Sequence, residues 1–329
     1  MKTVTYTEAL RKALSDEMEA DDSVFLLGED LGVYGGAFGV TRGLLERFGA
    51  ERVIDVPISE ASFTGVAVGA ALGGCRPVVE IMFMDFITLA VDQLVNQAAK
   101  LRYIFGPQSR CPMVLRTPGG GGRSYGPTHS QSLAGLFVQI PGLKVVAPST
   151  PDDAYWMLRA SIRDNNPVIF VEHKMLYGTK GSINSRSSGK SGFGKARIAV
   201  QGSDITVIAW SWMAVEAEIA AAQLAEEDIS VEVIDLRSLN PMDTQTITES
   251  AKKTGRVLVV EEGPGTAGTG AETACRISEN AGEYLDMPVR RLTSPEIPVP
   301  AAASLEKAAI PNRDTIVEAA ADLFNLSDS

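Results

Sequence analysis

The chain has 329 residues, of which 45% are hydrophobic and 22% are charged, and its formal net charge is -11. At roughly 150 residues per domain, this length predicts two domains with ample cores, and the composition argues against a disordered chain. The acidic balance argues against nucleic acid and anionic membranes as partners, because both attract clustered Lys and Arg. No stretch approaches the roughly 18 apolar residues of a membrane span.

The first residues and the cysteines indicate the compartment. The N-terminus lacks the apolar region of a secretory signal. Cys75, Cys111 and Cys275 lie far apart and show no zinc spacing. Because a sparse, odd set of cysteines is typical of a reducing compartment, we expect a cytoplasmic protein without a disulfide framework.

Short apolar runs alternate with runs of helical periodicity along the chain. In the first half we expect strands at 24–27, 52–56, 77–81, 113–116, 143–146 and 168–171, and helices from Thr7 onward and at 61–74, 86–103 and 152–163. In the second half we expect strands at 205–209, 231–234, 257–260 and 288–292, and helices at 215–224, 269–279 and 315–324. Such alternation predicts right-handed crossovers and mostly parallel sheets, and so an α/β fold.

A change of composition divides the chain. Residues 178–195 are mostly Gly, Ser and Lys with few apolar side chains, which is typical of an exposed linker. We therefore expect two α/β domains, at 1–185 and 186–329.

The residues alone leave two candidate site residues with two interpretations each. Glu60 follows a predicted strand and precedes a Gly/Ala-rich helix, so it is either a helix cap or a buried carboxylate with a raised pKa that faces a ligand. His129 lies in a Gly-rich loop, where it is either an acid–base group or a backbone-bonded loop residue. His173 directly follows a strand, which favours a structural role.

Two glycine runs, at 119–122 and 263–270, resemble phosphate loops. The second lies between a predicted strand and a predicted helix, where a helix N-terminus can bind an anion. It lacks the GxGxxG spacing and the Walker lysine, which weakens the phosphate interpretation. The chain also lacks the GDG motif by which thiamine enzymes hold Mg²⁺ and diphosphate.

Several long motifs occur in order between about residue 4 and residue 325, among them GEDLGVYGGAFGVTRGL, RVIDVPISEASFTG, EIMFMDFITLAVDQLVNQAAKLRY and VEVIDLRSLNPMD. In these motifs the chain resembles β subunits of the thiamine-diphosphate-dependent decarboxylase component of 2-oxoacid dehydrogenase complexes. The resemblance implies a pyrimidine-binding domain followed by a transketolase-type C-terminal domain. It also implies an α2β2 heterotetramer in which the α subunit holds the diphosphate and Mg²⁺ and the β subunit holds the aminopyrimidine, consistent with the missing GDG motif.

The resemblance assigns roles to individual residues. Glu60 matches the glutamate that bonds N1′ of the aminopyrimidine and so helps to activate thiamine diphosphate. Phe86 matches the aromatic residue that packs on the pyrimidine ring, and Ile58, Met82 and Phe83 are expected to line the same pocket. His129 matches the histidine proposed to assist proton transfer when the lipoyl group of the acyltransferase is reductively acylated.

The resemblance also suggests a metal site and a range of substrates. Some family members bind a structural K⁺, and the corresponding residues here are Met113, Ser161, Ile162, Asp164 and Asn166. Many pyruvate enzymes have Gln where Met82 stands, and EIMFMDF and EHKMLY look more like the acetoin branch. Pyruvate, acetoin and branched-chain 2-oxoacids therefore stay open as substrates, and a non-catalytic assembly subunit with a vestigial site is the alternative function.

The acidic charge has two interpretations. It either serves solubility alone or forms a face that docks a basic partner. In the family, the C-terminal domain docks the subunit-binding domain of the lipoyl acyltransferase. The acidic residues that we expect on that face are Glu283, Asp286, Glu296, Glu306, Glu318 and Asp322.

Overall fold

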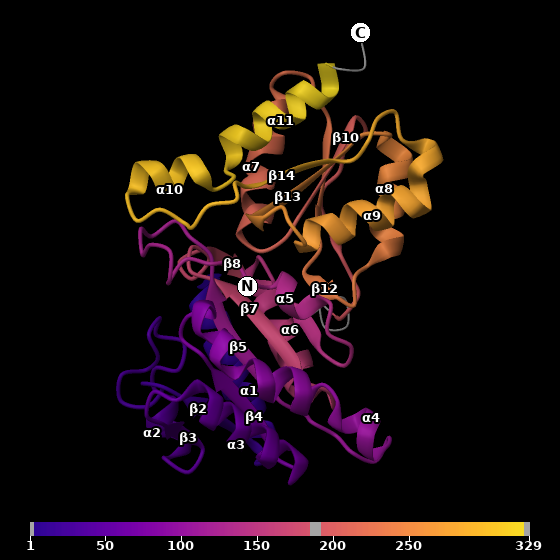
Figure 1. Cartoon of the computed structure of the whole chain (residues 1–329). Helices are drawn as coiled ribbons and strands as arrows, with labels where there is room; N and C mark the ends of the chain where they lie inside the picture. The colour runs from indigo at the N-terminus through magenta and orange to yellow at the C-terminus, as the bar shows by residue number, and fades with distance from the viewer. Residues whose placement is uncertain (1–2, 185–191, 326–329) are drawn as a thin grey trace. The chain divides into compact units, whose positions relative to one another are not determined.

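The computed structural model in Figure 1 describes residues 3–184 and 192–325 of the chain. These residues form two compact units that interleave along the sequence. Unit 1 comprises Met1–Gly119 and Leu136–Phe193, and unit 2 comprises Gly120–Gly135 and Gly194–Ser329. The predicted boundary between residues 185 and 186 lies outside the described residues. The units differ from two continuous domains in one segment, Gly120–Gly135, which belongs to unit 2.

A parallel sheet forms the centre of unit 1, with the strand order β6-β7-β5-β4-β2-β3. Its strands are β2 (Val24–Gly28), β3 (Val53–Asp55), β4 (Arg76–Glu80), β5 (Val114–Gly119), β6 (Lys144–Val146) and β7 (Val168–His173). Each coincides with a predicted apolar run, with ends that differ by a few residues. Every residue of β5 and β7 is buried, as expected for central strands that are covered on both faces.

The helices of unit 1 are partly those predicted. They are α1 (Tyr6–Ala20), α2 (Leu44–Phe48), α3 (Glu60–Leu72), α4 (Leu101–Phe105), α5 (Gly135–Val138) and α6 (Pro151–Arg163). The helix predicted from Thr7 is confirmed, but it starts earlier, because Thr5 and Glu8 bond each other's backbone N–H groups in a capping box. The single helix predicted at 86–103 is wrong: a 3₁₀ segment η1 (Met84–Ala90), a π segment η2 (Gln93–Ala98) and α4 follow one another there.

A small antiparallel pair lies partly in the predicted linker. Strand β1 (Thr3–Thr5) pairs with β8 (Lys180–Ser182). The exposed linker predicted from residue 178 onward thus contains a short strand at residues 180–182, which forms by backbone pairing with β1 and has no apolar side chains.

Unit 2 is built on a second sheet with the order β14-β13-β10-β11-β9, in which only β9 is antiparallel. Its strands are β9 (Arg197–Val200), β10 (Ile205–Ala209), β11 (Val231–Asp235), β13 (Val257–Pro264) and β14 (Arg290–Ser294). Its helices are α7 (Trp212–Ala225), α8 (Thr244–Thr254), α9 (Thr269–Ala281), α10 (Ala303–Ala309) and α11 (Arg313–Asn325). A short strand β12 (Ser238–Asn240) and a 3₁₀ turn η4 (Gly282–Tyr284) complete it. The sequence did not predict β9, β12, α8 or α10.

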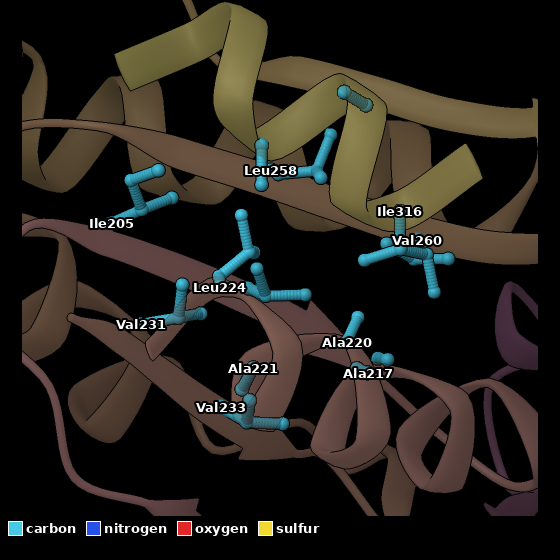
Figure 2. Packing of buried hydrophobic residues seen from close by; sticks show 14 of the residues in the cluster. Ile205, Ala217, Ala220, Ala221, Leu224, Val231, Val233, Leu258, Val260 and Ile316 are labelled. Atoms are coloured by element: carbon cyan, nitrogen blue, oxygen red, sulfur yellow. The ribbon is translucent and has the colours of Figure 1, made fainter. Parts of the chain in front are cut away.

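Alternating side chains give this sheet two covered faces. Figure 2 shows Ile205 and Val231 facing Leu224 of α7, with α11 on the same side. The opposite face of β10 presents Thr206, whose hydroxyl bonds Ser250 and Thr254 of α8. Burying each large aliphatic side chain contributes about 1.5–3 kcal/mol, so this core holds the strand ends of unit 2 in place.

No helix among residues 3–184 and 192–325 is long and apolar enough to cross a membrane.

A buried ion cluster joins the three central strands of unit 1. Arg116 of β5 donates to Glu80 of β4 at 2.6 Å, and to both carboxylate oxygens of Glu172 of β7 at 2.7 and 2.9 Å. The Tyr177 hydroxyl donates to Glu172 at 2.7 Å. The two carboxylates raise the already high pKa of Arg116 against the opposing effect of burial, so its charge is permanent. Burial and the second carboxylate, Glu80, raise the pKa of Glu172 even though Arg116 opposes them.

We predict that Arg116→Met lowers the free energy of unfolding by about 3–5 kcal/mol, because it leaves two buried carboxylates without their cation. Denaturant unfolding of the purified chain measures this change. The matched control is Arg276→Met, whose exposed pair with Glu272 contributes at most about 1 kcal/mol. Equal losses in the two variants would contradict the structural role of Arg116.

Candidate active site

Candidate site residues gather at the carboxyl edge of the unit 1 sheet. Glu29 directly follows β2, Glu60 begins α3 after β3, and Phe83 lies a few residues after β4. Parallel strands end at one edge of a sheet, and α/β folds bind their ligands outside that edge. The fold thus places these side chains where a ligand is expected.

Glu60 is a buried carboxylate that does not cap its helix. It is 6% exposed. The N-cap residue of α3 is Ser59, whose hydroxyl bonds Ser62 and not a helix N–H. Among the described residues, no hydrogen bond to the Glu60 carboxylate is present. Of the two interpretations left open by the sequence, the geometry favours a carboxylate kept for a ligand over a helix cap.

Glu29 is a second buried carboxylate, which the sequence interpretation missed. It is 7% exposed, and its Oε1 has no hydrogen-bond partner. Burial raises its pKa, and the nearby charges of Glu60 and Asp30 raise it further. Repulsion from the neighbouring carboxylate makes the ionised form of Glu29 less favourable. The signal in the sequence is the GED triplet at the end of β2.

An aromatic cluster adjoins this edge. The ring of Phe83 meets Phe38 edge-on at 5.7 Å, and Phe38 stacks on Tyr177 at 5.0 Å. The ammonium of the fully buried Lys174 lies 5.5 Å from the centre of the Phe83 ring. Through Tyr177, the cluster is connected to the Arg116 ion cluster. Phe83 was predicted as a pocket residue, whereas Phe38 and Lys174 were not.

The other pocket residues differ in exposure. Ile58 is 82% exposed, and Met82 and Phe86 are half-buried. Their contact with a pyrimidine ring stays a prediction.

His129 belongs to unit 2, in the segment Gly120–Gly135. Its Nδ1 lies 3.1 Å from the Thr128 hydroxyl, and its backbone N–H donates to the Gly126 carbonyl at 3.2 Å. His173 is buried at the end of β7, where its Nδ1 accepts the Met175 N–H at 3.1 Å. The structural interpretation of His173 agrees with this contact.

The last two N–H groups of the glycine run at 263–270 already bind a carboxylate of the protein. The carboxylate of Glu261, in β13, accepts the N–H groups of Thr269 and Gly270 at the start of α9. Burial raises the pKa of Glu261, although these two hydrogen bonds oppose it. An internal carboxylate thus already fills the anion position of this helix N-terminus, which argues against the phosphate interpretation.

The prediction of an acidic docking face is wrong for one residue, Glu306. Glu306 is only 3% exposed and its carboxylate bonds the loop 121–124, so it cannot present charge to a partner. The other five residues predicted for that face are exposed: Glu283, Asp286, Glu296, Glu318 and Asp322. Two of them also pair with arginines, Asp286 with Arg256 and Asp322 with Arg290.

Two of the residues predicted to hold K⁺ bind an arginine through their backbone carbonyl groups. Arg76 Nη1 donates to the carbonyl oxygens of Ile162 and Asp164, both at 2.9 Å. The Met113 carbonyl accepts the Val168 N–H. A K⁺ held by the Ile162 and Asp164 carbonyls would lie against a guanidinium, which would repel it. The carbonyl groups thus fit K⁺ poorly while Arg76 keeps this position.

Two family models match the chain, and between them they cover both units. The model "Transketolase, pyrimidine binding domain" matches residues 2–180, and "Transketolase, C-terminal domain" matches residues 194–316. A solved structure described as "Split gene transketolase, inactive beta4 tetramer" has a TM-score of 0.78 at 21% identity, covering 98% of this chain and 99% of that one. The fold is therefore that of the transketolase-type thiamine-diphosphate enzymes.

Curated relatives narrow this class. A rice (Oryza sativa subsp. japonica) protein named pyruvate dehydrogenase E1 component subunit beta-2, mitochondrial, is 46% identical over 97% of this chain and 86% of its own length. The subunit beta of the same component from Rickettsia bellii is 46% identical over 96% and 97%. That from Rhizobium meliloti is 46% identical over 97% and 69%. The chain belongs to the family of pyruvate dehydrogenase E1 component β subunits.

We predict that Glu29→Gln stabilises the chain at neutral pH and loses this effect in acid. Because the folded-state pKa of Glu29 is raised above its ordinary value of 4.5, ionisation costs the folded state more than the unfolded state. The wild-type penalty is absent below about pH 4.5 and grows as the pH rises through the folded-state pKa. Melting temperatures between pH 4.5 and 8 measure the difference.

The control for this experiment is Glu51→Gln, since Glu51 is exposed. A Glu29 variant whose melting temperature differs from wild type by the same amount at every pH would contradict the raised pKa.

Proposed function

We propose that this chain, together with an α subunit, uses thiamine diphosphate to decarboxylate pyruvate and to transfer the resulting acyl group to the lipoyl group of an acyltransferase. The relatives named as pyruvate dehydrogenase E1 β subunits support this proposal. The single observation that carries it is the buried Glu60 carboxylate, which caps nothing and lies within the pyrimidine-binding domain.

The residues of unit 1 fit an aminopyrimidine ring. A ring nitrogen that gains a proton needs a carboxyl group in a dry place, and Glu60 and Glu29 provide two. When bound, thiamine diphosphate supplies the electron sink for decarboxylation. Glu60 would hold the proton at N1′, and Glu29, whose pKa is raised by burial and by the nearby carboxylates, would take up a proton more readily than an exposed glutamate. Phe83, fixed by Phe38 and Lys174, would offer an apolar wall that keeps water out.

We assign the acyl-transfer step to His129. Imidazole is the side chain best suited to move a proton near neutral pH, which opening of the lipoyl disulfide requires. The Thr128 hydroxyl at its Nδ1 would orient the ring.

The missing GDG motif supports an α subunit as the holder of the diphosphate and Mg²⁺, in an α2β2 heterotetramer. The exposed acidic residues of unit 2 are the proposed docking face for the acyltransferase. The proposed domain boundary remains between residues 185 and 186, and the gap between the two matched family models, which end at 180 and begin at 194, supports it. Our proposed compartment remains the cytoplasm, although the rice relative is named mitochondrial. The structural K⁺ stays a prediction, and the proposed function does not depend on it.

Dye-coupled assays with pyruvate, acetoin and a branched-chain 2-oxoacid test the function. The chain alone is expected to be inactive, and with its α subunit, thiamine diphosphate and Mg²⁺ it is expected to prefer pyruvate. Glu60→Gln and Glu60→Ala should lower this activity by about 100-fold or more, because they remove a general acid–base group.

The matched control is again Glu51→Gln, which should keep wild-type activity. A preference for acetoin or a branched-chain acid would contradict pyruvate as the substrate. Full activity of the Glu60 variants would contradict the proposed role of Glu60 in the reaction. An assembled α2β2 protein without activity on any of the three would favour the alternative of a vestigial assembly subunit.

We predict that His129→Ala slows transfer to the lipoyl domain by about 100-fold while it changes dye-coupled decarboxylation little. The two rates are compared on the same preparation of the heterotetramer. The exposed neighbour Thr128, changed to Val, separates loss of the imidazole from loss of its orienting hydroxyl. Equal losses in both assays would argue against this role of His129.

A further inference from the structure

The glycine-rich loop that precedes His129 has an alternating backbone. Gly120, Gly122, Ser124 and Gly126 have positive φ values of 81°, 87°, 56° and 79°. Residues in this left-handed conformation, alternating with ordinary ones, turn successive N–H groups toward one side and form an anion-binding concavity. Ser124 adopts it at a cost that glycine does not bear, so the surrounding contacts must hold it there.

The anion in this concavity is a carboxylate of the protein itself. Glu306, in α10, accepts the N–H groups of Gly122 at 3.0 Å and Ser124 at 2.8 Å. Its Oε2 also lies 3.4 Å from the Ser124 hydroxyl. Glu262, in β13, accepts the Gly121 N–H at 2.6 Å. Hydrogen bonds from N–H groups to an ionised carboxylate are among the stronger ones in proteins, and Glu306 makes them while 3% exposed.

The loop also packs closely on the end of α10. A Cβ atom on Gly121 would come within 2.3 Å of Ile310 Cδ1 and 3.1 Å of Glu306 Oε1. A side chain at this position would therefore have to displace the side chain of Ile310 and crowd the Glu306 carboxylate. Hydrogen bonds and packing therefore attach the same few residues of the loop to α10.

The attachment continues to His129 through the backbone. The Gly120 N–H donates to the Gln131 carbonyl at 3.1 Å, which closes the segment on itself. Within it, the His129 N–H donates to the Gly126 carbonyl at 3.2 Å. A loop held at residues 121–124 and closed at residues 120 and 131 leaves the His129 backbone little freedom to move.

We propose that Glu306 is a positioning residue for His129: its carboxylate fills the concavity of the loop 120–126 and so fixes the segment from which the imidazole acts. This inference rests on the proposed role of His129 in acyl transfer. Glu306 is the buried residue of α10, whereas most of this helix is exposed. The buried Glu306 carboxylate therefore links α10 to the loop that carries His129.

The test uses the α2β2 holoenzyme with Glu306→Gln, which keeps the size and removes the charge, and Glu306→Ala. Backbone amides of residues 120–126 are expected to exchange with deuterium about 10-fold faster or more in both variants, as the loop opens more often. Transfer to the lipoyl domain should fall about 10-fold while dye-coupled decarboxylation stays within about 2-fold. The matched control is Glu51→Gln, an exposed glutamate of unit 1 that lies outside the proposed docking face.

A double variant separates positioning from general damage. If Glu306 acts through His129, Glu306→Ala combined with His129→Ala should transfer no more slowly than His129→Ala alone. Unchanged exchange, equal loss in both assays, or additive losses in the double variant would each overturn the proposal. If the unaltered enzyme transfers nothing to lipoyl groups, the proposed function fails and the positioning role with it, while amide exchange still shows whether Glu306 holds the loop.

Discussion

The fold of unit 1 depends on one buried guanidinium. Arg116 lies on the strand between β4 and β7 and holds a carboxylate from each, so three neighbouring strands share one cluster of charge. A slip of β5 by one residue would move Arg116 to the other face of the sheet and leave both carboxylates unpaired in the interior. The cluster therefore fixes the register of the strands whose carboxyl ends carry the site. Through Tyr177 and Phe38 it also supports the ring of Phe83.

The pattern of apolar residues in the sequence predicted the central strands of both sheets. Each central strand is a short apolar run buried on both faces, and such a run is visible without tertiary information. The segment 86–103 shows the limit, because the same apolar spacing is compatible with 3₁₀, α and π turns over so short a length. The segment also packs closely against α3: a Cβ atom on Gly65 would lie 3.5 Å from Gln93 Cγ. This close contact restricts the path of the backbone, and the sequence pattern alone does not reveal it.

In the candidate site, too, the sequence does not reveal which charged residues tertiary contacts bring together or bury. Glu60 was recognised by the motif around it, but the proximity of Glu29 depends on how β2 and α3 meet at the sheet edge. Glu306 was expected on the surface, as one of the acidic residues of the docking face, and glutamate is usually exposed. Its partners lie 182 and 184 residues earlier in the chain, so no local pattern could indicate its burial.

The interleaving of the two units has a consequence for how such proteins can recombine. Unit 2 takes the segment Gly120–Gly135 from within the sequence of unit 1, so residues 194–329 alone are not a complete module. A gene fusion that exchanges the C-terminal half between two relatives would join the Glu306 helix of one parent to the glycine loop of the other. Compatible halves must therefore match at this contact, and the loop and α10 are expected to be inherited as a pair.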